Sequence, residues 1–503
     1  MKLLGFRDAI PMDVPAANPG RDARASLLRE DPDAYARLID HLTRDVPQLR
    51  DWAARLKAGD AVVVLTGQQP ALLGGPLYTL YKTLTALAAA RRLRARGEPA
   101  IAAFWCVGDD TDFGEVSAAS WPVRGGPPRR VRDEMPANAR RLALLGSKRM
   151  RPTLQQMRDD WPTATIVDDV TRFTESNWSG FLKHGLRFLA GDEPFLFVDG
   201  NDLQVVRSAQ PWLRRFTDRR AGIADQITRL ARVEAEAGRA PAITGEEGRR
   251  ALFVADHGSR RVLGEDEAPA PSDLLLPNVI LRPALQEHLL PVDRVVCGEG
   301  EIAYRALLRP VFEMLGRTAA PLMNRFSATL FPPSWLRLDD RPGAAEVLER
   351  TDETLDAWGR RNIPEDLTAC LGDVRARIAD LLRELEAPLA GFDRSLPQVL
   401  ASAAGKVDSQ MERIEESVAG KGRIALYRRS PELAHLREFL LPRGRLQERS
   451  LVLWTPFLYE GIGALRDLDQ AIDAWFARGE TGHALLGLEE PTGAAPGAGE
   501  ARR

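Results

Sequence analysis

The chain has 503 residues, of which 44% are hydrophobic and 28% charged, a composition typical of globular proteins and not of disordered ones. Its formal net charge of −2 gives no reason to expect a nucleic-acid or membrane partner, and no uncharged apolar run approaches the roughly 18 residues of a membrane helix. Three scattered cysteines and a first segment without a signal-peptide pattern predict a cytoplasmic protein with no disulfide framework.

The order of apolar and polar segments predicts several parts, as expected for a chain of this length. Residues 1–335 form an α/β core, in which residues 126–270 approximately are inserted segments. Residues 340–440 have a purely helical pattern, and residues 441–486 return to globular patterning. Residues 487–503 are rich in Gly, Ala and Pro and are expected to be a disordered tail.

Residues 62–112 have the pattern of one βαβ unit. A buried strand (AVVVLTGQQ), a glycine-bearing turn, a helix over residues 78–96 and a second buried strand (AIAAFWCVG) follow one another. Open α/β sheets bind ligands at the carboxyl ends of their strands, so polar residues there are candidates for a site. Shorter apolar runs predict further strands at 165–167, 195–198, 251–254, 261–263, 277–282 and 294–297.

The first strand ends in Gly67, Gln68 and Gln69. The glycine lets the backbone approach a ligand closely, and each glutamine offers an uncharged donor and acceptor. The alternative is a capped turn in which the glutamines pair with the backbone. Lys82, on the helix that follows, is one of only seven lysines in an Arg-rich chain. It is either a substrate contact or a solvated helix residue.

The second strand ends in an acid cluster, Asp109, Asp110 and Asp112. Carboxylates this close repel one another unless a cation lies among them. They can hold Mg²⁺, bind a substrate amine or act as a general base. The alternative is an Asp-rich helix N-cap.

A later strand opens into CGEGEIAY and a helix. Gly298 and Gly300 leave backbone N–H groups open, and Glu301 can either reach inward or cap the helix. Cys297 is either a nucleophile or a small core residue. None of the six histidines has a metal-ligand spacing, so no metal site is predicted.

Two stretches in the helical part carry apolar residues at alternating steps of four and three. They are separated by a break at residues 388–397. The pattern predicts an antiparallel coiled-coil hairpin, which favours a homodimer; the alternative is a pair of amphipathic helices packed on a core. The apolar positions are Val374, Ile378, Leu381 and Leu385, then Leu400, Ala403, Val407, Met411, Ile414 and Val418.

Several ungapped blocks, in order, are similar to the bacillithiol biosynthesis cysteine-adding enzyme family. This resemblance implies a Rossmann-like core with inserted connecting segments and a protruding antiparallel α-helical coiled-coil hairpin. The blocks are TGQQPALLGGPLYTLYK (66–82), FWCVGDDTDFGEV (104–116), LPNVILRPALQEHLLP (276–291), GEGEIAYRALLRPVFEMLG (298–316), RFSATL (325–330) and GRLQERSL (444–451).

The resemblance also implies a reaction, in which the carboxyl of L-cysteine is joined to the amine of glucosaminyl-malate in the last step of bacillithiol biosynthesis. An amide needs an activated carboxyl, so ATP and Mg²⁺ are expected, and cations should contact the malate carboxylates, with Lys82, Arg282 and Arg325 as candidates. The residues expected to be catalytic are Asp109, Asp110, Asp112 and Glu301. Those expected to bind substrate are Gly67, Gln68, Gln69, Tyr78, Lys82, Asn278, Arg282, Gly298, Gly300, Tyr304 and Arg325.

The chain departs from the family pattern at three positions. Thr111 stands where the family usually has His in the acid cluster, and Cys297 and Glu299 replace the glycine and proline of a Gly-Gly-Pro-Gly-Glu run. These departures keep two other hypotheses open. One is a non-catalytic coiled-coil scaffold that kept an old core, and the other is a nucleotide-sugar transferase built on a similar sheet.

Overall fold

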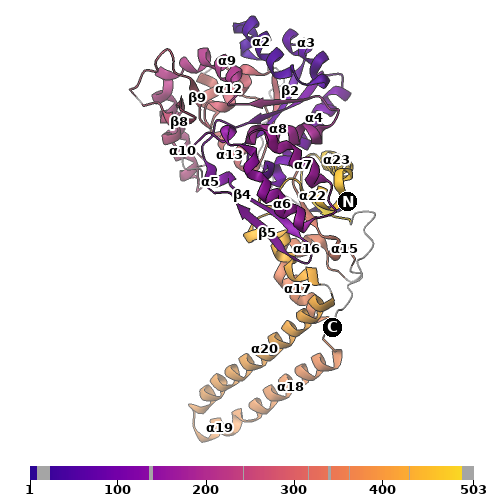
Figure 1. Cartoon of the computed structure of the whole chain (residues 1–503). Coiled ribbons are helices and arrows are strands. Elements are labelled where there is room, and N and C mark those ends of the chain that lie inside the picture. The colour runs from indigo at the N-terminus through magenta and orange to yellow at the C-terminus, as the bar shows by residue number, and fades with distance from the viewer. Residues whose placement is uncertain are drawn as a thin grey trace. The chain divides into compact units, whose positions relative to one another are not determined.

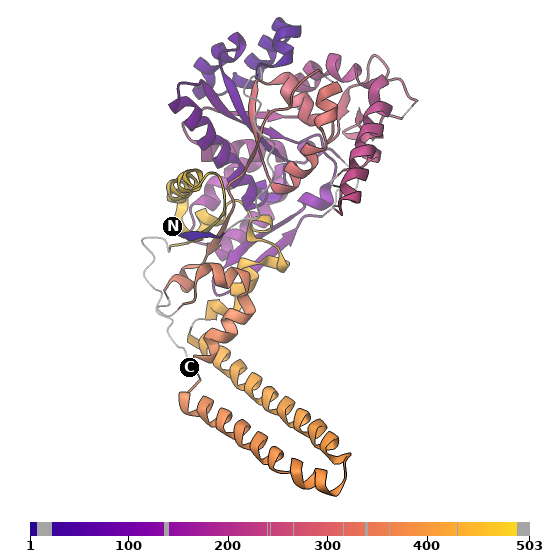
Figure 2. The same ribbon diagram turned by 180° about the vertical axis from the view of Figure 1, so that it is seen from behind.

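The structure is a computed structural model of the chain, and it divides into two compact units (Figures 1 and 2). The first comprises Met1–Pro122, Arg129–Thr329 and Leu446–Arg503, and the second Val123–Pro128 and Leu330–Arg445. The described residues are 1–7, 23–134, 140–238, 240–241, 243–264, 266–314, 316–337, 341–361, 363–429 and 431–489.

A five-stranded sheet forms the centre of the first unit (Figure 1). Its strands lie in the order β11-β10-β2-β3-β6, and all the neighbouring pairs are parallel. Counted across the sheet from β6 to β11, its strands are the third, second, first, fourth and fifth of this sheet along the chain. This is the Rossmann order, with its switch point between β2 and β10. The α/β Rossmann-like prediction is therefore confirmed. The strands are β2 (Val62–Gln68), β3 (Ala100–Cys106), β6 (Phe195–Asp199), β10 (Val292–Cys297) and β11 (Leu322–Asn324).

Helices cover both faces of this sheet, which is why its strands are continuous apolar runs. Helix α4 (Leu77–Ala95) packs against β2 and β3 on one face. On the other face, Val63 and Leu65 of β2 join a core that includes side chains of α2 (Pro32–Thr43) and α9 (Leu203–Arg214). Successive side chains of a strand point to opposite faces, so one strand supplies both cores.

Two of the predicted strands are wrong. Residues 165–167 belong mostly to helix α7 (Ile166–Arg172), because an apolar run this short does not distinguish strand from helix. In residues 277–282, strand β9 (Leu275–Pro277) has already ended, and Arg282 begins helix α12 (Arg282–Leu289). The side chain of Asn278 accepts hydrogen bonds from the backbone N–H groups of Ile280 and Leu281 and so turns the chain between the two elements.

The inserted segment contributes two of the three strands of a small antiparallel sheet, whose order is β8-β7-β9. Strands β7 (Leu252–Asp256) and β8 (Ser259–Val262) are joined at His257 and Gly258, both with positive φ, as in the tight turns that match strand twist. The strands predicted at 251–254 and 261–263 are therefore present, shifted by one or two residues. The hairpin presents Phe253 and Arg260 to the site described below.

The C-terminal segment packs with the first unit. Helix α23 (Ala464–Ala477) contacts α4, and β13 (His483–Gly487) pairs antiparallel with β1 (Lys2–Arg7). Leu488, which follows the boundary expected at residue 486, is also fully buried. Residues 490–503, most of the predicted tail, lie outside the described residues. Among the residues that the structure describes, no helix is long and apolar enough to cross a membrane.

The second unit contains a helical hairpin that the heptad pattern predicted, and the coiled-coil prediction is confirmed. Helix α18 (Glu365–Glu384) runs antiparallel to α20 (Leu396–Arg429), with the short α19 (Glu386–Phe392) between them (Figure 1). Arg375 of α18 lies 2.6 Å from Asp408 and 3.1 Å from Glu415, both on α20. These ion pairs connect the two helices, although each stabilises the hairpin little at an exposed position.

The other helices and strands complete the two units. They are α1 (Ser26–Glu30), α3 (Arg50–Ala58), α5 (Phe113–Val116), β4 (Ala118–Val123), β5 (Gly126–Arg132), α6 (Arg151–Asp160), α8 (Trp178–Ala190), α10 (Arg220–Glu236), α11 (Gly245–Arg249), α13 (Glu299–Ala306), α14 (Arg309–Met314), β12 (Ala328–Phe331), α15 (Pro333–Leu336), α16 (Ala344–Glu349), α17 (Thr351–Arg360), α21 (Leu436–Leu440) and α22 (Thr455–Glu460).

Candidate active site

A cavity of about 660 Å³ lies within the first unit, at the carboxyl ends of β2 and β10. Side chains from β2, α4, α12, α13 and the β7–β8 hairpin line it. Its volume is typical of small-molecule sites, and its position is the topological switch point, where open α/β sheets bind ligands.

Most of the residues singled out in the sequence come together in this cavity. Asp109 and Asp112 do not line it. The residues that do are Gly67, Gln68, Gln69, Tyr78, Lys82, Asp110, Asn278, Arg282, Gly298, Gly300, Glu301, Tyr304 and Arg325.

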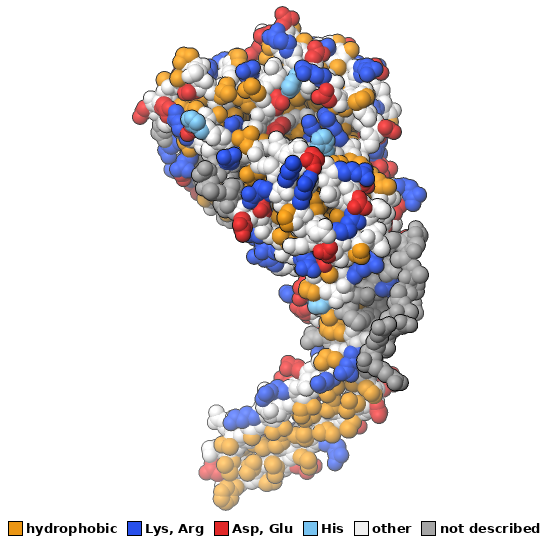
Figure 3. Space-filling model, viewed as in Figure 1, with side chains coloured by type: hydrophobic (Ala, Val, Ile, Leu, Met, Phe, Trp, Pro, Cys, Tyr) orange, Lys and Arg blue, Asp and Glu red, His pale blue; other side chains and the backbone are white. Residues whose placement is uncertain are grey.

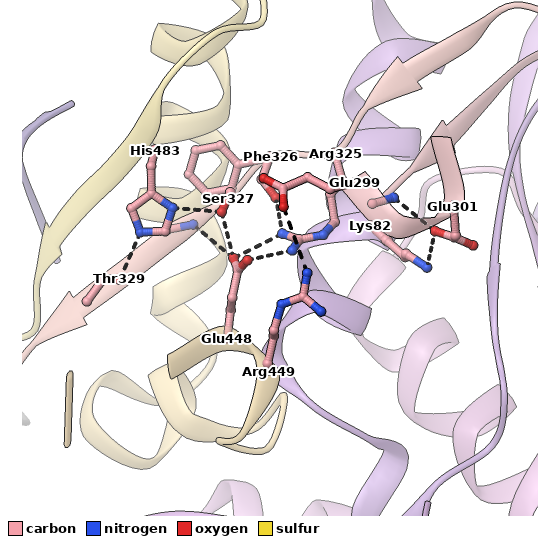
Figure 4. Close-up of polar contacts among 12 residues, drawn as sticks. Lys82, Glu299, Glu301, Arg325, Phe326, Ser327, Thr329, Glu448, Arg449 and His483 are labelled. Carbon is pink, nitrogen blue, oxygen red and sulfur yellow. Dashed lines mark hydrogen bonds and ion pairs between the residues drawn. The ribbon is translucent and has the colours of Figure 1, made fainter. Parts of the chain in front are cut away.

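Lys82 is buried, with a side chain only 4% exposed, so the alternative of a solvated helix residue is wrong. Its ammonium donates to the carbonyl oxygen of Gly67 and to Oε1 of Gln68, both at 3.0 Å. The third contact is an ion pair with Glu301 at 2.6 Å (Figure 4). An ammonium has three hydrogens, so Lys82 has no donor left for a substrate.

Glu301 has both of the roles that the sequence left open. Its Oε2 accepts the backbone N–H of Gly298 at 2.9 Å, which caps α13, and the carboxylate also faces Lys82. Burial raises the pKa of Glu301, but the Lys82 ammonium and the Gly298 N–H outweigh burial and hold the pKa below its usual range. Glu301 therefore stays ionised and fixes both neighbours.

Arg325 is paired in the same way with a residue that the sequence did not single out. Its guanidinium binds both carboxylate oxygens of Glu448 (Figure 4). Burial raises the pKa of Glu448, but Arg325 outweighs burial and lowers it. Ser327 Oγ also donates to Glu448 at 2.9 Å and lies 2.7 Å from His483 Nδ1, while His483 Nε2 lies 2.8 Å from Thr329 Oγ1. These contacts satisfy a neutral imidazole that donates through Nδ1, and burial lowers the His483 pKa to about 4.

Asp110 is the one acid-cluster residue that lines the cavity, and its carboxylate is already occupied. It forms an ion pair with Arg260 and accepts from Gln69 Nε2 at 2.6 Å and from the Thr111 backbone N–H at 2.7 Å. Burial raises the pKa of Asp110, but Arg260 and Arg282 outweigh burial and lower it. A carboxylate held in this state is a weak base, so the geometry gives it a positioning role.

The other two acids lie elsewhere. Asp109 is 2% exposed, and its Oδ2 lies 3.7 Å from Arg260 Nη1 and 4.0 Å from Arg282 Nη2, behind the cavity wall. Asp112 is exposed and accepts from the Glu115 backbone N–H at 3.1 Å, so it is the N-cap of α5. The helix-cap alternative is therefore correct for Asp112.

A wall of the cavity built from α12 and α13 carries cations with donors to spare. Arg305 donates to Gln286 Oε1 at 3.0 Å. The buried Nε atoms of Arg282 and Arg305 have no hydrogen-bond partner among the described residues. Both arginines line the cavity, so they are the candidate contacts for an anionic ligand. We call Arg282, Gln286 and Arg305 the open wall, and Lys82, Glu301, Arg325 and Glu448 the paired cluster.

Sequence reasoning missed much of the lining. Several of these residues come from the inserted segment, whose position relative to the sheet no local pattern reveals. Gln286 and Arg305 were within the matched blocks, and Arg305 lies one helical turn after Glu301, which was a usable signal. The missed residues are Glu115, Glu246, Glu247, Arg250, Phe253, Arg260, Gln286, Arg305 and Arg449.

Two residues of the strand ends have structural roles. Cys297 is 1% exposed, and burial raises its pKa to about 12. It is therefore a core residue, and the nucleophile alternative is wrong. Gly67 is required by packing, because a Cβ there would lie 2.5 Å from the carbonyl oxygen of Trp105 on the neighbouring strand.

The donor set does not form a magnesium site from protein groups alone. Asp110 faces the guanidinium of Arg260, and no group of three His, Cys, Asp or Glu residues within the described ranges can hold a metal ion. Mg²⁺ is commonly held by one or two carboxylates together with nucleotide phosphates. The cations of the open wall suit an anionic substrate instead.

Comparisons with known proteins agree on one family. Residues 33–270 and 265–326 match the model described as bacillithiol biosynthesis BshC, N-terminal Rossmann-like domain, and residues 343–474 match the BshC C-terminal coiled-coil domain. A relative in Solibacter usitatus (strain Ellin6076), named "Putative cysteine ligase BshC", is 29% identical over 466 residues and covers 87% of each chain. One of the same name in Geobacillus thermodenitrificans (strain NG80-2) is 29% identical and covers 80% of each chain. Among solved structures, Leishmania major tyrosyl-tRNA synthetase in complex with tyrosinol covers 65% of this chain and 37% of its own, with 12% identity and a TM-score of 0.24, too low to support an argument.

Proposed function

The chain belongs to the bacillithiol biosynthesis BshC family, and from this membership we propose that it is a cysteine ligase. The proposed reaction joins L-cysteine to the amine of glucosaminyl-malate, the last step of bacillithiol biosynthesis. The observation that carries the proposal is convergence: residues from all six matched blocks, which extend along the chain from Thr66 to Arg449, line one cavity at the switch point of the sheet.

The charges of the cavity support different roles for the paired cluster and the open wall. Lys82 and Arg325, expected to bind the malate carboxylates, are instead neutralised by Glu301 and Glu448. In the open wall, Arg305 donates to the neutral Gln286 and Arg282 lies no closer than 4.0 Å to a carboxylate, that of Asp109, and guanidinium groups bind carboxylates in a planar, two-pronged geometry. We therefore assign the malate end of the acceptor to the open wall.

The chemistry requires an activated acyl group, because a carboxylate does not react with an amine directly. We propose that a nucleoside triphosphate, ATP with its Mg²⁺, activates the cysteine carboxyl as an acyl phosphate or acyl adenylate. The amine nitrogen then bonds to the acyl carbon, the bond to phosphate or nucleotide breaks, and the nitrogen loses a proton to water. The protein's part is to hold the two substrates together, which alone can remove a large share of the barrier.

The departures from the family pattern at Thr111 and Glu299 do not alter the contacts on which the proposed function rests. The backbone N–H of Thr111 makes the contact to Asp110, so that contact does not depend on the side chain at this position. Glu299 is 69% exposed and lies 3.9 Å from Arg449 at the rim. A scaffold without activity would have no need for buried charges, which are costly to desolvate, and a nucleotide-sugar transferase is supported by fold analogy alone.

We also propose a homodimer formed through the hairpin and a location in the cytoplasm. Apolar side chains gather on the hairpin surface (Figure 3), among them Leu381 at 59%, Val399 at 62% and Phe392 at 86% exposure. An exposed apolar stripe of this kind favours association with a second helix pair. The cytoplasmic assignment is supported by the three cysteines, which are all unpaired.

Thiol analysis by mass spectrometry, in the source organism with and without this gene, tests the proposal. Loss of bacillithiol with accumulation of glucosaminyl-malate is expected, and a wild-type copy should restore the thiol. An unchanged thiol pool in the deletion strain would contradict the function.

A further inference from the structure

One hydroxyl group in the cavity carries a hydrogen for which the described residues offer no acceptor. Tyr78 lies on α4 and lines the cavity. Gln68 Nε2 donates to Tyr78 Oη at 3.2 Å, and within the described ranges this is the only hydrogen bond of the hydroxyl. A phenol has one O–H donor, so the hydrogen of Tyr78 remains available to whatever occupies the cavity.

The direction of this hydrogen bond is fixed by Lys82. An ammonium can only donate, so the atom of Gln68 that lies 3.0 Å from Lys82 Nζ must be the amide oxygen. The NH₂ group of Gln68 is then the end that faces Tyr78, and the phenol oxygen must accept. Lys82 itself is fixed by Glu301 at 2.6 Å and by the Gly67 carbonyl. The order Glu301, Lys82, Gln68, Tyr78 therefore leaves the phenol hydrogen without an acceptor among the described residues.

The surroundings of Tyr78 keep its phenol protonated and place two cations beside its ring. Burial first, and then the carboxylates of Glu115 and Glu301, raise the pKa of Tyr78 to about 12, so the phenol remains protonated at neutral pH. Lys82 Nζ and Arg325 Cζ lie 5.6 and 5.8 Å from the ring centroid. Both cations are within the range of cation–π attraction.

We propose that Tyr78 donates its hydroxyl hydrogen to the oxygen of the cysteine acyl group during amide formation, an assignment that rests on the proposed function. When the amine nitrogen bonds to the acyl carbon, an electron pair moves onto this oxygen, and the negative charge is released when the C–O bond to phosphate or nucleotide breaks. A donor already aimed at the oxygen stabilises this charge without reorganising. Gln68 and Lys82 are then positioning residues, because they act through Tyr78.

The test compares two variants of the full-length protein that remove the same donor in different ways. Tyr78→Phe deletes the hydroxyl. Gln68→Glu replaces the amide by a carboxylate, which still accepts a hydrogen bond from Lys82. Because a carboxylate has no N–H to donate, Tyr78 must become the donor in its contact with residue 68, and its hydroxyl hydrogen then turns away from the cavity. Tyr81→Phe is the matched control, since its buried hydroxyl on the same helix has no hydrogen-bond partner among the described residues.

We expect kcat to fall about 100-fold in Tyr78→Phe and in Gln68→Glu, with KM for cysteine little changed, because one preorganised donor is typically worth that much. The double variant should be no slower than either single variant, since both lose the same interaction. Tyr81→Phe should match the wild type, and thermal unfolding should show all four variants folded.

Two outcomes overturn the assignment and can be told apart. An active wild type with a Tyr78→Phe variant within about threefold of its kcat overturns the role of Tyr78 alone, as do multiplicative losses in the double variant. A folded wild type that makes no amide product overturns the proposed function, and the role of Tyr78 with it, before any variant is measured.

Discussion

The paired cluster and the open wall face the same cavity but differ in how their charges are satisfied. In the paired cluster each cation has a carboxylate partner, and nearly every donor is used. In the open wall only the Nε atoms of Arg282 and Arg305 lack a hydrogen-bond partner among the described residues, while Arg305 donates to Gln286 and Arg282 lies 4.0 Å from Asp109. Buried charges that satisfy one another set a geometry, whereas buried donors without partners mark the position of a ligand. The comparison predicts that changes to the paired cluster disturb folding and catalysis, and changes to the open wall disturb binding.

The largest expected effect follows from removing one partner of the paired cluster. Lys82→Met leaves the Glu301 carboxylate, whose side chain is 28% exposed, without its counter-ion, and breaking a buried ion pair typically costs about 3–5 kcal/mol. Urea denaturation should show this loss of stability, together with loss of activity. Lys57→Met is the control, because the Lys57–Asp40 pair is exposed and its loss should change stability by less than about 0.5 kcal/mol. Equal effects of the two changes would contradict the comparison.

The next effect is a pH dependence that comes from the support of the paired cluster. The His483 pKa is about 4 in the folded protein, against an ordinary value of 6.5. Between these values the unfolded chain binds a proton that the folded protein does not, so stability is complete above pH 6.5 and falls as the pH approaches 4. The loss reaches about 3 kcal/mol. Denaturation across this window should show a smaller decline in His483→Gln than in the wild type, and parallel declines would argue against the assignment.

A smaller and different effect is expected at the open wall. Arg282→Gln should raise KM for glucosaminyl-malate roughly 30-fold, equivalent to about 2 kcal/mol for a hydrogen bond to a charged group. It should lower folding stability less than Lys82→Met, because Asp109 keeps Arg260 at 3.7 Å. Steady-state kinetics with each substrate in turn measure the change in KM. Arg250→Gln is the matched control at the rim, where Arg250 already pairs with Glu246 at 2.8 Å. If KM for cysteine rises instead, the open wall binds the other substrate.

The smallest expected effect extends the comparison to the hairpin, where apolar side chains, and not hydrogen-bond donors, are without a partner among the described residues. Leu381→Glu puts a charge into the exposed stripe and should weaken the dimer about tenfold, which corresponds to the burial of part of one leucine. Light scattering over a concentration series measures the change. Ala376→Glu, on the opposite face of the same helix by its heptad position, should leave the dimer unchanged. A protein that is monomeric before any change would contradict the proposed homodimer.

The sequence predicted the sheet and most of the cavity because both depend on local signals. Apolar runs that end in Gly, Gln or Asp place polar groups at the switch point of the sheet, and the resemblance supplied Arg282 and Arg325. The ion-pair partners of Arg325 and Asp110 could not be predicted. Glu448 lies 123 positions from Arg325, and Arg260 lies 150 positions from Asp110 in an inserted hairpin. Ion pairing over such separations depends on tertiary packing, which periodicity does not encode.

The most direct test of the central claim uses the purified full-length protein with L-cysteine, glucosaminyl-malate and ATP with Mg²⁺. Mass spectrometry follows the amide product, and nucleotide analysis follows cleavage of the triphosphate. The account predicts that bacillithiol forms with one triphosphate cleaved for each amide made. A folded protein that forms no bacillithiol from these substrates would contradict it.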